Sequence, residues 1–144
     1  MSYATEASAI ETYLKAGITG IPVGFEKKGF GNATTRIEAH IQNGDVLQGS
    51  IGRIADRIDN VGVLQLVIYT GPDANANRRT YAETIETLFR GKRIKSDGTA
   101  VGSGDTEFIR FSPQDQHPYI ASNQNSGGEQ RTVMNVPFVR YEFK

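Results

Sequence analysis

The segment from Val61 to Thr70 constrains the fold more than any other part of the sequence. It reads Val-Gly-Val-Leu-Gln-Leu-Val-Ile-Tyr-Thr, and only Gln65 interrupts its apolar character before the terminal Tyr69 and Thr70. An apolar run this short, ended by Gly71-Pro72-Asp73, predicts a central strand that is covered on both faces. The chain must therefore build a sheet with other elements packed against it.

Two segments have the periodicity of amphipathic helices. In the first, from Thr5 to Ala16, Ile10 and Leu14 recur at helical spacing, and Gly17 is placed to end the helix. The second runs from Ala74 or Asn75 to Arg90 and is ended by Gly91. Its apolar side chains fall at the spacing of one buried helix face: Tyr81, Ala82, Ile85, Leu88 and Phe89.

Several other segments alternate between apolar and polar residues, as half-buried strands do. Thr35 to Ile41 is the clearest, because Ile37, Ala39 and Ile41 face one way, and Asn43-Gly44-Asp45 then predicts a turn. The remaining predicted strands are Ile21–Phe25, Thr99–Val101, Glu107–Phe111, Tyr119–Ile120 and Arg131–Phe143.

Three stretches do not follow these patterns. Residues 46–60 fit a short helix or two strand ends around a long loop, so we treat them as an irregular excursion and a candidate contact surface. Ser122 to Gly128 is polar throughout and predicts a loop. Pro137 cannot donate a ladder hydrogen bond, so its strand must lie at an edge or carry a bulge there.

These elements predict one α+β domain over residues 1–144. Its sheet is a single mixed, mainly antiparallel one, with the two main helices packed on one face. The chain has 16 basic and 16 acidic residues, which argues against a strongly basic nucleic-acid binder. It contains no cysteine and no apolar run near the ~20 residues of a membrane span, so we expect a protein made in the cytosol that does not enter membranes.

Catalytic motifs are not found in the sequence. It has neither the Gly-x-Ser-x-Gly of a nucleophile elbow nor a phosphate-binding P-loop, and with no cysteine it offers no thiol. His40 and His117 are predicted to be surface residues. Asp56 and Asp59 could share a helix face beside Arg53 and Arg57, but these alternating charges are better explained as salt bridges, within the chain or to a neighbour. We therefore expect no enzyme, no cofactor and no metal site.

Four basic residues lie close together after the second predicted helix. They are Arg90, Lys92, Arg93 and Lys95. Positive charge at a helix C-terminus offsets the helix dipole, and this is the simpler interpretation. The alternative is a patch that faces a phosphate or a partner.

The order of the segments matches a known pattern. A helix ending at Leu14-Lys15-Ala16 precedes Ile21-Pro22-Val23, and a strand containing Val67-Ile68-Tyr69 ends in Gly71-Pro72-Asp73. A helix with the sequence Tyr81-Ala82-Glu83-Thr84-Ile85-Glu86-Thr87-Leu88-Phe89 follows, and Val136-Pro137-Phe138-Val139-Arg140-Tyr141 closes the chain. In this layout the sequence resembles the tail terminator (tail-completion) proteins of long-tailed bacteriophages.

The resemblance implies a structural protein of the virion, made in the cytoplasm of the host bacterium and located at the head-proximal end of the tail. Such proteins assemble as rings, commonly hexamers, on the end of a finished tail tube. The ring stops tube polymerisation and offers a joining surface for head-completion or neck proteins. The implied partners are copies of the chain itself, the tail tube protein and a neck protein, and DNA only passes through the lumen.

Within this interpretation, the residues expected at the subunit interface are Arg53, Asp56, Arg57 and Asp59, whose alternating charges could pair around a ring. Reversing Arg57 to Glu should then weaken ring formation, as measured by light scattering, and leave the monomer folded. Two alternatives from other classes stay open. One is a small metal-dependent nuclease that uses Asp56 and Asp59. The other is a monomeric module that adds a peptide strand to an edge at Arg131–Phe143.

Overall fold

One mixed sheet of seven strands and two α-helices make up the fold, so the predicted α+β class is confirmed. The computed structural model describes residues 1–26, 35–48, 57–71, 75–104, 107–126 and 129–143. The elements are α1 Tyr3–Gly17, β1 Val23–Phe25, β2 Arg36–Gln48, β3 Arg57–Thr70, α2 Asn75–Phe89, β4 Arg93–Ile94, β5 Ile109–Phe111, the 3₁₀ turn η1 Pro113–Asp115, β6 Tyr119–Ser126 and β7 Glu129–Phe143.

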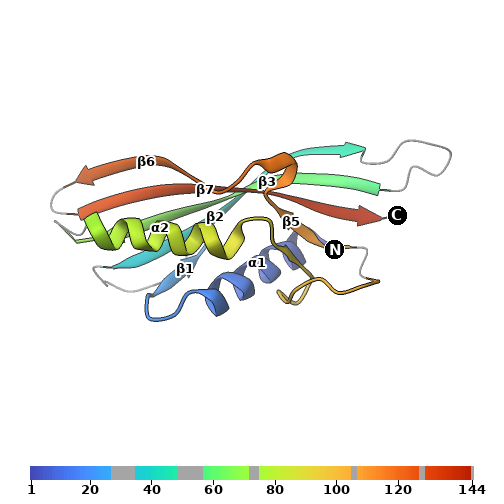
Figure 1. Cartoon of the computed structure of the whole chain (residues 1–144). Coiled ribbons are helices and arrows are strands. Elements are labelled where there is room, and N and C mark those ends of the chain that lie inside the picture. Colours follow the sequence, from blue (N-terminus) through green and yellow to red (C-terminus); the bar gives the residue numbers. More distant parts are fainter. Residues whose placement is uncertain (27–34, 49–56, 72–74, 105–106, 127–128, 144) are drawn as a thin grey trace.

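The sheet has the strand order β1-β2-β3-β7-β5-β4, and β6 also pairs with β7. All the pairings are antiparallel except that between β1 and β2. On the side away from β3, β7 is shared by two strands: β5 pairs with its C-terminal part and β6 with its N-terminal part. The long strands β2, β3 and β7 cross the whole molecule, and their far ends extend past the two helices at the right of Figure 1.

Both helices pack on the same face of the sheet, as predicted. This face, called the helix face below, carries Leu64, Leu66 and Ile68 of β3, all fully buried. They belong to one core cluster with Ile10 and Leu14 of α1 and with Ile85 and Phe89 of α2. The opposite face, called the outer face, carries the alternate residues of β3. The prediction that β3 is covered on both faces is therefore wrong, because its outer residues are only half-buried.

The helix boundaries follow from local chemistry. The Ser2 hydroxyl accepts a hydrogen bond from the Thr5 amide at 3.1 Å and caps α1. The sequence predicts Gly17 as the residue directly after the helix, but it is the last residue of α1. A Cβ at Gly17 would lie 2.4 Å from the end of the Leu88 side chain of α2, so a larger residue here would require that side chain to move. Gly91 does end α2 as predicted, with a positive φ of 65°.

The predicted turn at Asn43-Gly44-Asp45 is a bulge inside a long strand. Asn43 lies opposite Gly62 and Val46 opposite Asn60, so β2 holds one extra residue over this step. The strand then continues to Gln48, and β3 begins at Arg57. Of the two interpretations of residues 46–60, the described parts therefore support two strand ends.

Three predictions in the C-terminal half are corrected. The polar stretch expected to be a loop from Ser122 forms most of β6, which pairs with β7 up to Ser126. Thr99–Val101 is not a strand and contributes only a bridge from Ala100 to Ile94. The segment Arg131–Phe143 is not an edge, because β7 has β3 on one side and β5 and β6 on the other.

Pro137 is accommodated in this interior strand by a break in its neighbours. The carbonyl of Pro137 accepts a hydrogen bond from the Ser112 amide at 3.2 Å, so its ring nitrogen faces the same side. On that side the β5 pairing ends at Phe138 and the β6 pairing begins at Asn135. The missing donor therefore coincides with the gap between the two strands.

Candidate functional site

Two strands of the sheet present free edges on its opposite sides. The pairing of β1 with β2 ends at Ala39, and the Ile41 amide donates to the Glu26 carboxylate at 3.0 Å. Beyond this point, from Gln42 to Gln48, no described strand covers the side of β2 away from β3. We call this stretch the β2 edge. The second, the β6 edge, is Tyr119–Ser126, which pairs with β7 on one side only.

The exposed large hydrophobic side chains gather on these two edges. Val46 and Leu47 on the β2 edge are 54% and 53% exposed, and Tyr119 and Ile120 on the β6 edge are 51% and 45% exposed. Within the described ranges, only Tyr3 of α1 joins them in this class. Large apolar side chains left in water on a sheet edge favour contact with another protein surface.

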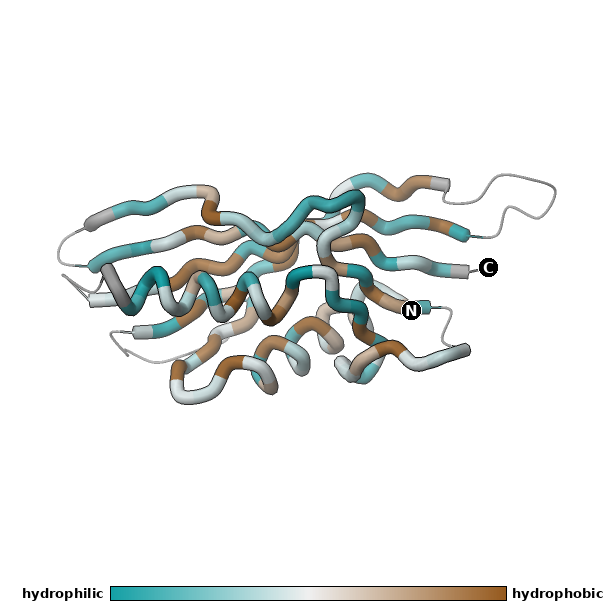
Figure 2. The backbone as a smooth tube through the Cα atoms, in the orientation of Figure 1, coloured by the Kyte–Doolittle hydropathy of each residue, from teal (hydrophilic) through white to brown (hydrophobic). Residues whose placement is uncertain are grey.

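Neither edge carries lysine, proline or a run of charged side chains, and the single β-bulge in each strand is the only protecting feature in the described residues of these edges. Natural edge strands are commonly guarded by lysine, other charged side chains or proline. The β6 edge has the sequence Tyr-Ile-Ala-Ser-Asn-Gln-Asn-Ser and holds no charge, and Figure 2 shows that most of it is hydrophilic. The β2 edge carries only Asp45, which lies in the bulge. Both edges are thus suited to accept another strand.

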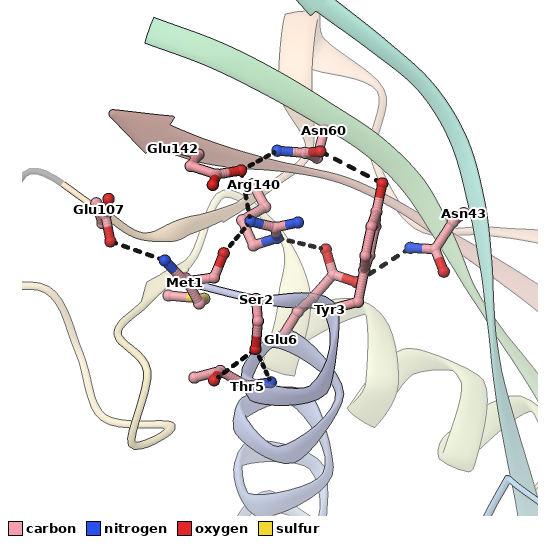
Figure 3. A network of polar contacts seen from close by, with 10 residues as sticks. All are labelled: Met1, Ser2, Tyr3, Thr5, Glu6, Asn43, Asn60, Glu107, Arg140 and Glu142. Atoms are coloured by element: carbon pink, nitrogen blue, oxygen red, sulfur yellow. Dashed lines mark hydrogen bonds and ion pairs between the residues drawn. The ribbon is translucent and has the colours of Figure 1, made fainter. Parts of the chain in front are cut away.

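A buried polar cluster joins α1 to the strand ends that bear the β2 edge (Figure 3). The Arg140 guanidinium donates from Nε to Oε1 of Glu6 at 3.0 Å, and both side chains are almost fully buried. The second carboxylate oxygen of Glu6 accepts from Nδ2 of Asn43 at 3.1 Å. Since Asn43 is the last regular residue before the bulge, Glu6 contacts the β2 edge directly before its bulge.

Further contacts extend the cluster across the sheet. Glu142 accepts from the Arg140 guanidinium and from the Asn60 amide, each at 3.4 Å. The Tyr3 ring lies 5.0 Å from the guanidinium carbon, and its hydroxyl donates to Asn60 at 3.5 Å. The carbonyl of Met1 also accepts from Arg140. These contacts fix the N-terminal turn of α1 on β3 and β7.

The expected interface residues fall into two groups. Arg53 and Asp56 lie outside the described residues. Arg57 and Asp59 are brought together within the chain, with Nε of Arg57 3.0 Å from Oδ1 of Asp59, and the guanidinium also lies 4.8 Å from the Tyr141 ring. The pairing of these charges inside one chain was one of the two possibilities, and the Asp59 carboxylate is occupied by it.

The four basic residues after α2 have separate surroundings. Arg90 forms an ion pair with Glu86 one turn earlier in α2. Arg93 in β4 lies over the Phe108 ring at 5.6 Å and is paired in register with Arg110. Lys92 is exposed, whereas Lys95 is half-buried. All four follow the last helical residue, Phe89.

A second polar group lies on the outer face and was not predicted. Glu38 accepts from the Tyr69 hydroxyl at 3.2 Å and contacts Nε2 of His40 at 2.9 Å. Burial raises the pKa of Tyr69, and the adjacent Glu38 carboxylate raises this pKa further. Arg36 lies over the Tyr69 ring at 4.0 Å. Strand alternation places Glu38 and His40 on one face, so part of this group was visible in the sequence.

The described part of the chain contains no group of three or more His, Asp or Glu side chains arranged to hold a metal ion. Nor is any helix in the described ranges both long and apolar enough to cross a membrane.

Comparisons with known proteins identify the fold alone. No protein-family model matches the chain, and no curated protein sequence matches it. Several solved structures are similar to the chain. For one of them the TM-score is 0.68 and the sequence identity 13%, and the match covers 100% of this chain and 98% of that chain. At this sequence identity, the similarity shows a shared fold and does not show a shared activity.

Proposed function

We propose that the chain is a structural protein that closes the end of a bacteriophage tail tube, as the resemblance to tail terminator proteins implies. The observation that carries the proposal is the pair of free sheet edges on opposite sides of one sheet, of which the β6 edge has no charge and the β2 edge only Asp45. Copies of such a chain have two different surfaces for contact with their neighbours. Heterologous contacts of this kind close into a ring when the rotation between copies allows it.

A terminator must also stop a polymer without extending it. A closed ring meets this requirement because all lateral edges are used within the ring, and only its two flat ends remain for partners. One end would contact the tail tube protein and the other a head-completion or neck protein. The equal numbers of basic and acidic residues suit such a particle, since neither like copies nor passing DNA meet a large net charge.

The role is one of assembly and not of catalysis. Asp59, a candidate carboxylate for a nuclease, is paired with Arg57, so the described geometry gives that alternative no support. The proposed location is the head-proximal end of the tail in the virion.

The experiment that tests the function is localisation on the particle. The chain is tagged in the phage or prophage that encodes it, and isolated tails are labelled through the tag and imaged by negative-stain electron microscopy. We expect label at one end of each tube, on the side that joins the head. Label distributed along the tube, at the distal tip or in the soluble fraction only would refute the proposal. Tagged tube protein, which should label the whole length, is the control.

A further inference from the structure

The two free edges match one another in their apolar side chains, in the faces that these side chains occupy and in the position of a bulge. We propose that the β2 edge of one copy pairs with the β6 edge of the next copy, as antiparallel strands, so that the sheet continues from subunit to subunit. The inference rests on the proposed function for its setting, because it names the contact that would build the ring. The occupant of each edge is a second copy of this chain.

The exposed apolar side chains of the two edges can lie opposite one another. In an antiparallel pairing, Val46 can lie opposite Ile120 while Leu47 lies opposite Tyr119. In a parallel pairing only one of these two oppositions can form at a time. The four most exposed hydrophobic side chains on the described edges then cover one another. Cross-strand pairs of apolar side chains are the main stabilising contacts between neighbouring strands.

The same pairing places each apolar side chain opposite one on the same face of the sheet. Val46 lies opposite Asn60 in β3, and Ile120 lies opposite Met134 in β7, and both positions belong to the helix face. Leu47 lies opposite Asp59, and Tyr119 opposite Asn135, which places both on the outer face. A slip of one residue would turn every side chain to the wrong face. The same register therefore satisfies both faces of the sheet.

The β-bulges of the two edge strands also match in position. β2 carries one extra residue between Asn43 and Val46, and β6 carries one extra residue between Ile120 and Ser122. In the proposed register these two bulges lie side by side. Because each strand bends at the same level, the pairing can continue on both sides of the bend.

The register also defines how neighbouring copies are displaced. Val46 is level with Asn60 of β3, whereas Ile120, through Met134, is level with Leu66 of β3 in its own copy. Neighbours are thus shifted by six residues along the strands, or about 20 Å. A constant shift between copies makes the strands tilt relative to the axis of a closed sheet.

Disulfide trapping tests this register directly, because the chain has no native cysteine to interfere. The double variant Val46→Cys/Ile120→Cys is oxidised at high protein concentration and analysed on a non-reducing gel. Within one chain the two positions lie on opposite sides of β3 and β7, so a bond between them joins two copies. We expect a ladder that extends beyond the dimer, since each linked copy keeps one cysteine of each kind for the next.

The matched control is Val46→Cys/Asn123→Cys, which moves one thiol along the same face of β6. Because of the bulge, Asn123 lies only two ladder positions from Ile120, so its thiol would be about 7 Å out of register, still beyond disulfide reach, and we expect about tenfold less cross-linking. Leu47→Cys/Tyr119→Cys should give the same ladder from the outer face. To verify the edge without a disulfide, Ile120→Lys should abolish concentration-dependent association, whereas Thr87→Lys on the exposed side of α2 should not.

Three results would overturn the inference. Equal cross-linking in the control variant would show that the edges touch without a fixed register. Products that stop at the dimer would show a two-fold arrangement of two copies. No cross-linking at millimolar protein would show that the edges do not pair. The cross-linking experiment and the localisation experiment can fail independently. A ladder together with no label at the tube end would leave the pairing standing and refute the tail role. Correct label without a ladder would do the reverse.

Discussion

Replacing Glu6 by alanine should destabilise the protein far more than the loss of one surface charge. The substitution removes the carboxylate that accepts from Arg140 at 3.0 Å and from Asn43 at 3.1 Å. The Arg140 side chain is only 2% exposed and keeps Glu142, at 3.4 Å, as its remaining acidic partner. A guanidinium left buried in this way costs about 3–5 kcal/mol of the free energy of unfolding.

This cost is large compared with the total stability of a domain of this size, which is about 5–15 kcal/mol. The thermal midpoint should fall by about 8–15 °C. Urea and thermal unfolding are followed by far-UV circular dichroism, since the chain contains no tryptophan for fluorescence.

Two variants make the comparison specific. Glu11→Ala removes a carboxylate from the same helix, where it pairs with the half-exposed Lys15, and should cost only about 0.3–0.5 kcal/mol. Glu6→Leu/Arg140→Met removes both buried charges and should recover much of the loss of the single variant. If Glu6→Ala costs no more than Glu11→Ala, the buried ion pair does not hold α1 to the strands and the reasoning fails.

Three further predictions concern the core and the pH dependence. Gly62→Ala places a Cβ 2.5 Å from the ring of Phe138, so we expect a loss of about 1–3 kcal/mol in urea unfolding, and a neutral result would show that the ring moves freely. Phe89→Ala empties a site where that ring packs edge-on against Phe111 at 4.9 Å; the expected loss is about 3–5 kcal/mol, and one below about 1 kcal/mol would mean that the aromatic cluster collapses without cost. Burial raises the pKa of Tyr13 above its ordinary value of 10.0, so the phenol ionises first in the unfolded chain. Its contribution to stability is therefore present below about pH 10 and is lost as the pH rises through the higher folded pKa; Tyr13→Phe should flatten this alkaline decline, and an unchanged pH profile would contradict the assignment.

The regular elements of the fold could be predicted wherever a single face of the chain is buried. The helix from Asn75 was predicted from its periodicity and the strand that ends at Thr70 from its apolar run, and both are found, although only one face of the strand is fully buried. Of β6, the start at Tyr119–Ile120 was predicted, but the part from Ser122 was missed because Ser122 and its polar neighbours have no face to bury. An edge strand is held mainly by backbone hydrogen bonds to its neighbour, and these leave no trace in the sequence.

The candidate site was predicted less well, for a related reason. Arg57 and Asp59 are two apart on a strand and so share a face, which favours the pair that they form with each other. The contact between Glu6 and Arg140 joins residues 134 positions apart, and no local pattern reveals it. Its only signal was the place of Glu6 one turn before Ile10 on the apolar side of the helix. The match between the two edges required the observed register of β2 and β6.

The length of tails made without the chain tests the central claim most directly. The gene is deleted from the phage or prophage, and tail lengths are measured by electron microscopy before and after the intact gene is supplied from a plasmid. If the chain closes the tube, its loss should give tails of widely varying length that do not join heads, and the plasmid should restore one length. Tails of normal, uniform length that join heads in its absence would contradict the account.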